Sequence, residues 1–401
     1  MGLPAKLQTL VGNYSFVVIV ICGLLIALIA LCFTEIGSRF QRTGGPQLYA
    51  SIAYGPTMGF AVGWLLWISR LGTCAAVSNL LVDYGQVLLP VLAQPFARAL
   101  TIALLVCAYM FINIRGIRQT SAVNTVFTVA KLVPLFTFAA VGVFFIEPHA
   151  LQLGALPPAG DLSTAILLAA FAFLGFDSTT ILAGEVREPQ RSVPFAILIS
   201  VSIVIVLYTL IQIVCVGTLP DLANSERPLS DAATVFAGPW ASIAVAVTAV
   251  VACAGVYGAS ITPATRLLFA MADHQQLPAA LAQIHPRLRT PVSAIVASSI
   301  AALVLALSGS FIYLVKITLI ARVIIYAITC LTLPVFRRRT DVPKAAVIIP
   351  GATVIACVCA ILCVAFLVKS SMRELLDVGL GVLLGLAIAA LTRRFSRSPV
   401  L

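Results

Sequence analysis

The residues of this chain that could do chemistry are the few charged or conformationally permissive ones inside long apolar stretches. The most informative is Asp177, in the run Phe-Ala-Phe-Leu-Gly-Phe-Asp-Ser-Thr-Thr at 171–180. Gly175 precedes it by two residues, and glycine allows the backbone to open. We therefore expect a helix in two halves, with a break near Gly175. Open backbone survives at membrane depth only where protein or water covers it, so its carbonyl and amide groups should face a cavity.

Asp177 has two interpretations. An acid within a membrane segment is costly and is a candidate functional residue by default. The alternative is that it caps the second half-helix, although a cap can also line a site.

Arg70 is a second candidate. It lies in the middle of a span predicted over 58–89, with Thr73, Cys74 and Val77 on the same helical face. An arginine at that depth must face a cavity or a partner. Arg70 and Cys74 are therefore candidate residues of a binding pocket.

Two interpretations of the buried cations remain open. One is structural pairing of Arg70 with Asp177, Asp83 or backbone carbonyl groups. The other is surplus positive charge in a pocket that accepts a ligand with an additional carboxylate. The same two interpretations apply to two more buried cations, Lys316 and Arg322.

Lys131 lies inside the span predicted over 123–145. It could extend its ammonium group to the headgroups of the nearer membrane surface. If it is desolvated instead, the neutral amine is favoured and the side chain can release a proton.

The composition defines the elements that position these residues. Of 401 residues, 61% are hydrophobic and 10% are charged, which predicts an all-α, polytopic membrane protein. The net charge of +11 does not indicate nucleic acid, because the basic residues lie in short loops. The ten cysteines lie in apolar runs and act as packing residues, and Cys357-Val-Cys359 lacks the spacing of a metal site.

Eleven complete spans are predicted. They cover 14–36, 58–89, 96–114, 123–145, 162–182, 195–216, 241–271, 292–307, 311–336, 346–368 and 375–391. A short amphipathic segment is expected at 47–54, and a short helix at about 4–10 on the outer side. Met1 begins no signal peptide.

Lysine and arginine are distributed unequally between alternate loops, which predicts the orientation. The larger set has 15: Arg39, Arg42, Arg115, Arg118, Arg187, Arg191, Arg287, Arg289, Arg337, Arg338, Arg339, Lys344, Arg393, Arg394 and Arg397. The smaller set has five: Lys6, Arg98, Arg227, Lys369 and Arg373. The first set, and with it the C-terminus, is expected in the cytoplasm. Glu35, Glu185 and Glu188 are expected to anchor the inner loops by pairing with Arg39, Arg187 and Arg191.

Five motifs occur in an order that resembles the amino acid–polyamine–organocation permease superfamily. They are Gly-Leu-Pro-Ala at 2–5, the loop at 34–46, the break at 171–177, the loop at 183–194, and the inner loop at 271–278 with 285–291. The likeness covers residues 2 to about 339. It implies a single permease domain with an inverted repeat of five helices, 1–147 and 160–339, followed by two helices in 340–401. The first and sixth helices are broken and meet at the substrate.

The resemblance also implies roles for particular residues. The glycines of the first helix, of which this chain has Gly2, would hold a substrate carboxylate. Carbonyl groups around Phe173 and Gly175 would take the amine, and Phe171 would cover the substrate. In relatives with a lysine at the place of Lys131, its ammonium occupies the position where others bind sodium, which implies proton coupling. The chain begins where that family's first helix breaks, which suggests that Met1 is an internal residue or that the chain is truncated.

These observations predict a proton-coupled transporter of amino acids in the cytoplasmic membrane, with no metal or cofactor. No nucleophile elbow, phosphate loop or histidine cluster indicates an enzyme, although a membrane-embedded enzyme acting on lipid or amine stays open. Two further functions also stay open: a transport-deficient relative that acts as a sensor or scaffold, and an exchanger of amino acids or amines.

Overall fold

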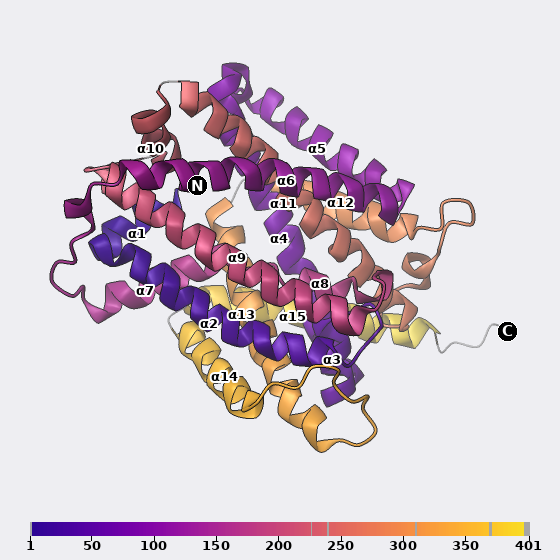
Figure 1. Ribbon diagram of the computed structural model, residues 1–401. Helices are drawn as coiled ribbons and strands as arrows, with labels where there is room; N and C mark the ends of the chain where they lie inside the picture. The colour runs from indigo at the N-terminus through magenta and orange to yellow at the C-terminus, as the bar shows by residue number, and fades with distance from the viewer. Residues whose placement is uncertain (1, 226, 239, 309–310, 369–370, 397–401) are drawn as a thin grey trace.

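The computed structural model describes residues 2–225, 227–238, 240–308, 311–368 and 371–396, without the side chains of 117–118, 311–314, 316 and 393–396. Met1, Lys369, Arg397 and the side chains of Arg118, Lys316, Arg393 and Arg394 therefore lie outside the described residues. Every regular element of the described chain is a helix (Figure 1). The predicted all-α class is confirmed.

The helices follow the apolar runs of the sequence. In the first half they are α1 (Leu3–Val11), α2 (Ser15–Gly37), α3 (Pro46–Tyr54), α4 (Pro56–Leu88), α5 (Pro95–Arg115) and α6 (Ile117–Gly142). In the second half they are α7 (Ala159–Ala172), α8 (Ser178–Ile181), α9 (Pro189–Thr218), α10 (Pro228–Ala237), α11 (Trp240–Asp273), α12 (Val292–Leu307) and α13 (Phe311–Arg338). Two helices follow, α14 (Ala352–Val368) and α15 (Met372–Ser396).

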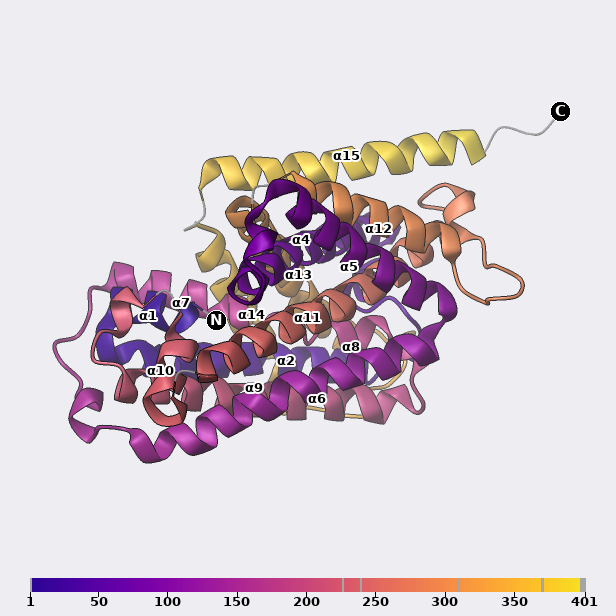
Figure 2. The same cartoon turned by 90° about the horizontal axis from the view of Figure 1, so that it is seen from above.

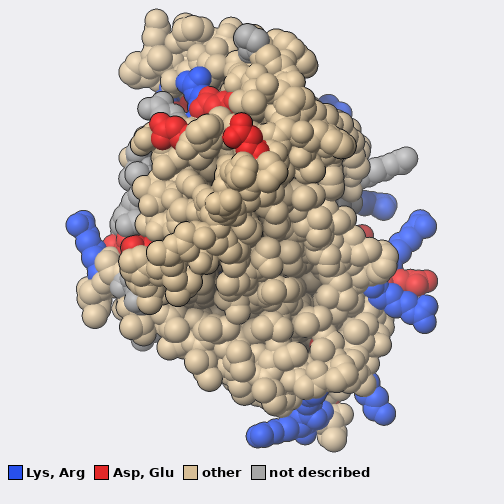
Figure 3. All heavy atoms as spheres, turned by 60° about the vertical axis from the view of Figure 1, so that its left-hand side comes forward, with Lys and Arg blue, Asp and Glu red and all other residues tan. Residues whose placement is uncertain are grey.

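Eight stretches of the described chain are long and apolar enough to cross a membrane, and α7, α12 and α14 are shorter apolar helices. Together they account for the predicted spans, and the short helices expected at 4–10 and 47–54 are also present as α1 and α3. Figure 3 shows a broad surface almost free of charge, with acidic and basic side chains gathered toward its edges. Such a surface suits the hydrocarbon layer of a bilayer.

Three helices begin about six residues from their predicted starts, for local reasons. Helix α6 begins at Ile117 rather than at residue 123, directly after Gly116, which has a φ of 117°. Helix α9 begins at Pro189 rather than at residue 195, because the polar turn after Pro189 is already helical and proline favours a first helical position. Helix α14 begins at Ala352 rather than at 346, because Gly351 has a φ of 68° in the turn before it.

Helices distant in the sequence pack in a regular set of pairs. Helix α1 packs on α7, α2 on α9, α4 on α11 and α5 on α12. In Figures 1 and 2, α2 and α9 run side by side, and α15 lies along the outside of α4 and α13. The main core lies between α2, α4, α7, α13 and α14, and it surrounds the loop between α7 and α8.

Candidate functional site

The span predicted over 162–182 is broken, as expected. Helix α7 ends at Ala172, α8 begins at Ser178, and the five residues between them form turns. Gly175 has a φ of 121°, which side-chain-bearing residues rarely adopt. The glycine therefore permits the chain to leave one half-helix and enter the next.

The break leaves backbone groups without backbone partners. In this described segment no backbone–backbone hydrogen bond reaches the carbonyl oxygens of residues 172–174, or uses the amides of residues 175–177. The carbonyl of Gly175 accepts from the amide of Ser178 at 3.1 Å, so it is not among the open acceptors. Of the carbonyl groups expected to bind an amine, that of Phe173 thus has no backbone partner. The carbonyl groups of residues 172 and 174 also have none.

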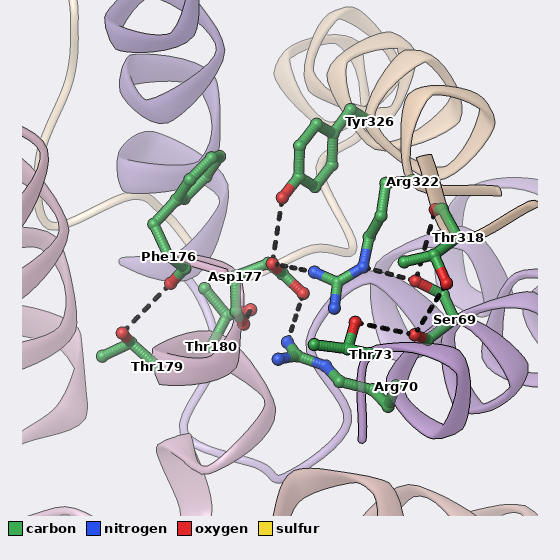
Figure 4. A network of polar contacts seen from close by, with 10 residues as sticks. All are labelled: Ser69, Arg70, Thr73, Phe176, Asp177, Thr179, Thr180, Thr318, Arg322 and Tyr326. Atoms are coloured by element: carbon green, nitrogen blue, oxygen red, sulfur yellow. Dashed lines mark hydrogen bonds and ion pairs between the residues drawn. The ribbon is translucent and has the colours of Figure 1, made fainter. Parts of the chain in front are cut away.

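Asp177 is the centre of a buried network of charges. Its Oδ2 accepts a hydrogen bond from Nη2 of Arg70 at 2.6 Å, and its Oδ1 accepts from Nη1 of Arg322 at 2.6 Å. The hydroxyl of Tyr326 donates to the same Oδ1 at 3.0 Å. Figure 4 shows the three donors converging on the carboxylate from two sides. Asp177 is fully buried, and each arginine is 2% exposed.

This geometry corrects the capping interpretation. Asp177 occupies the N-cap position of α8, but its side chain makes no capping hydrogen bond and turns onto the arginines instead. The structural pairing considered for Arg70 and Arg322 is what the structure contains. Asp83 is not the partner of Arg70, because it binds Nη1 of Arg98 at 2.7 Å.

The network carries more positive than negative charge. Two guanidinium groups share one carboxylate, and Nε of Arg322 donates to the hydroxyl of Ser69 at 2.6 Å. Nε of Arg70 is buried and has no hydrogen-bond partner in the described structure. A buried donor without an acceptor is unfavourable, so Arg70 has capacity for one more anionic or polar oxygen.

Three aromatic rings support the network. Phe176 in the break, Phe33 of α2 and Tyr326 of α13 contact one another, with ring centroids 5.2 to 5.4 Å apart. This packing fixes the position of the Tyr326 hydroxyl. The sequence analysis did not identify Ser69 or Tyr326 as site residues. The signal available there was their position: Ser69 precedes Arg70, and Tyr326 lies one helical turn after Arg322.

The other predicted site residues are distributed more widely. Phe171 is on the last turn of α7 and is 36% exposed, whereas the ring of Phe173 is buried against Tyr208 at 5.5 Å. Cys74 packs into a separate core region, with its Sγ 3.8 Å from the carbonyl of Tyr257. The structure therefore does not place Cys74 at the break.

Gly2 and Lys131 lie on other elements. Gly2 precedes α1, and its carbonyl accepts from the amide of Lys6 at 3.4 Å. Lys131 is partly buried and has no ion pair with a described residue. It lies one turn beyond Phe127, whose Cβ packs closely against Gly255 of α11, so both are on the same face of α6.

Of the three acidic residues expected to anchor loops, Glu35 pairs with Arg39 as predicted, whereas Glu185 has a different partner. Glu185 binds Nε of Arg266 in α11 at 2.9 Å, rather than Arg187 or Arg191. Glu35 does contact Arg39, at 3.5 Å, and also accepts two hydrogen bonds from Arg337, at 2.7 and 2.8 Å. For Glu188 the structure shows two backbone hydrogen bonds, from the amides of Arg191 and Ser192 to its carbonyl, each at 3.0 Å.

A bundle of apolar helices, one of which opens around a buried charge network, is typical of a polytopic membrane transporter. The sequence model of the amino acid permease family matches residues 2–378, and the chain belongs to that family. The predicted resemblance is confirmed.

Characterised relatives share about a quarter of their residues with this chain. It is 26% identical over 379 residues to the methylthioribose transporter of Bacillus subtilis, which covers 89% of the chain and 80% of the relative. It is 25% identical over 370 residues to the branched-chain amino acid permease BcaP of the same species, covering 86% and 79%. It is 27% identical over 306 residues to the mitochondrial cationic amino acid transporter 3 of Arabidopsis thaliana, covering 71% and 50%.

Proposed function

We propose that this permease carries amino acids across the cytoplasmic membrane by alternating access around the break between α7 and α8. The observation that carries the proposal is the set of open backbone groups at 172–177, in the middle of an apolar segment that opens between two half-helices. Open carbonyls attract an ammonium group and open amides attract a carboxylate. A zwitterionic amino acid offers both groups.

The relatives support this substrate class and also extend it. Two of them are named for branched-chain and cationic amino acids, and one is named for methylthioribose. The backbone groups of the break recognise the part that all amino acids share, so they do not choose among side chains. Selectivity must come from side chains near the break, such as Phe171 and Arg70.

The arrangement of helices supports the two-repeat organisation that we propose, 1–147 and 160–339. A short helix that begins with proline precedes a long central helix in each half, as α3 before α4 and as α10 before α11. The packing pairs α1–α7, α2–α9, α4–α11 and α5–α12 join equivalent positions of the two halves. The loop charges favour a cytoplasmic C-terminus.

We propose that protons drive transport and that Lys131 is the coupling group. Its partly buried ammonium lies on the face of α6 that packs against α11. A lysine held there without an ion pair to a described carboxylate is a candidate for proton release. Proton release then couples to transport if two conformations hold the ammonium with different strength.

The surplus charge at Arg70 favours a substrate with an additional carboxylate. Asp177 balances one of the two arginines, and the open Nε of Arg70 supplies a donor. Part of the network would have to rearrange for a substrate to reach this donor, because Arg70 is 2% exposed.

The direct test is uptake into proteoliposomes that contain the purified protein. A panel of labelled acidic, neutral and basic amino acids, together with methylthioribose, should show accumulation of at least one amino acid above that of protein-free liposomes. Counterflow with preloaded unlabelled substrate separates an exchanger from a net transporter. A protein that binds an amino acid but moves none in either assay would favour a sensor, and one that neither binds nor moves any would overturn the proposal.

A further inference from the structure

Three buried cysteines from distant parts of the chain meet inside the bundle. Cys32 of α2, Cys330 of α13 and Cys359 of α14 each have 0% exposure. Their Sγ atoms all lie within 4.8 Å of one another. In the described part of the chain this is the one group of three or more metal-binding side chains that are this close. The pair Cys357-Val-Cys359 does not contribute as a unit, because Cys357 is exposed.

We propose that Cys32, Cys330 and Cys359 bind a thiophilic metal ion of the class that includes monovalent copper and divalent zinc and cadmium. Thiolates select such ions over magnesium or calcium. With a metal–sulfur distance of about 2.3 Å, three sulfurs around one ion in a plane lie about 4.0 Å apart. The observed triangle therefore needs little adjustment to hold an ion at its centre. Each thiol that binds as thiolate releases its proton to the solvent.

The surroundings balance the charge of such a centre. A divalent ion with three thiolates carries a charge of −1, as does a monovalent ion with two thiolates and one thiol. Glu35 lies one turn after Cys32 in α2 and pairs with both Arg39 and Arg337, so this neighbouring group carries +1. An ion in the thiol cluster would leave the whole region neutral, which reduces the cost of burying it.

The position of the cluster suggests what the ion does. The buried face of α14 consists of small residues, Ala352, Ala356, Cys359, Ala360 and Cys363, and it packs against α2 and α13. Small side chains let helices approach closely, so the three cysteines of α2, α13 and α14 can meet at this interface. A metal ion bonded to one cysteine of each helix would fasten α14 to the transporter core.

The test uses cadmium as the probe, because it is redox-inert and its bonds to thiolate give an ultraviolet charge-transfer absorption. The parent protein carries Cys107→Ser and Cys357→Ser, which removes the two exposed thiols. Membranes are incubated with cadmium before solubilisation, and the purified protein is analysed for metal content, absorption and thermal unfolding. We expect one cadmium per chain, a thiolate–cadmium band and a rise of several degrees in Tm.

Further replacement of Cys359 or Cys330 by alanine should remove the bound cadmium, the band and the rise in Tm. Cys215→Ala is the matched control, because Cys215 is equally buried in a different core region. The Tm of each variant without metal shows whether that variant is folded. If Cys359→Ala or Cys330→Ala does not fold, Cys32→Ala is used in its place. No stoichiometric cadmium in the parent, or equal binding after loss of a cluster cysteine, would show that the three thiols only pack.

Discussion

Asp177 occupies the N-cap position of α8, yet its carboxylate accepts a hydrogen bond from Arg70, 107 residues earlier in the chain, at 2.6 Å. The amides at the start of α8 therefore have no capping side chain. Instead, an ion pair connects the second half-helix to α4. A second ion pair, to Arg322 of α13, makes Asp177 the residue that holds three elements together.

Asp177→Asn should destabilise the protein strongly. The substitution leaves two buried guanidinium groups without a counter-ion, and loss of one partner of a buried ion pair costs about 3–5 kcal/mol. The matched control is Asp83→Asn, whose partner Arg98 is 31% exposed and whose own side chain is 52% exposed. An exposed pair of this kind contributes about 0–1 kcal/mol. Thermal unfolding of both variants in detergent measures the difference, and equal losses would contradict the importance of the network.

Gly175→Ala should destabilise the break even though the site has room for a methyl group. No atom lies within 4 Å of the added Cβ, so the cost comes from the φ of 121° alone. Backbone strain of this type costs about 1–3 kcal/mol.

Gly160→Ala provides the contrast for this prediction. It also meets no atom within 4 Å, but it lies in the first turn of α7 with an ordinary φ. There alanine should raise stability by about 0.5–1 kcal/mol through its helix propensity. Thermal unfolding that shows the same sign for both glycines would rule out backbone strain at Gly175.

Arg70→Gln should change which amino acids compete for uptake. Glutamine keeps polar atoms near Asp177 but removes the surplus charge, so inhibition by acidic amino acids should weaken about tenfold relative to neutral ones, or about 1.4 kcal/mol. Competition assays in proteoliposomes measure this ratio. A lower protein yield with an unchanged competition profile would limit Arg70 to a structural role.

Lys131→Ala should abolish accumulation driven by a pH gradient while counterflow continues. Without a titratable group on α6, substrate exchange is still possible but protons no longer drive it. Lys131→Arg serves as a second variant, since it keeps the charge but does not release a proton. Uptake is measured under a pH gradient with and without sodium. Wild-type accumulation in the alanine variant would exclude Lys131 as the coupling group, and a sodium requirement would exclude proton coupling.

The sequence was sufficient to predict the spans and the break, because both depend on local properties. Apolar runs of about 20 residues define membrane helices, and Gly175 before Asp177 indicated where one helix opens. The polar first turn of helix α9, which begins at Pro189, was missed because its residues do not belong to the apolar run that predicted the span.

The partners within the site depended on long-range packing. Arg70, Arg322 and Tyr326 meet Asp177 across separations of 107 to 149 residues, and no local pattern specifies which faces of α4 and α13 turn toward the break. Cys32, Cys330 and Cys359 were expected to be packing residues, and their convergence could not be predicted for the same reason. Only the packing of α14 against α2 and α13 shows that they converge.

The two ends of the break have different neighbours, although the packing of α2 on α9 joins the two sets of helices. Helix α7 packs on α1 and α2, whereas Asp177 is tied to α4 and α13 and α8 packs on α9 and α11. Fully extended, the five residues between them would reach about 17 Å. A substrate bonded to the open carbonyl and amide groups of this loop would therefore touch a segment that connects both sets of neighbours.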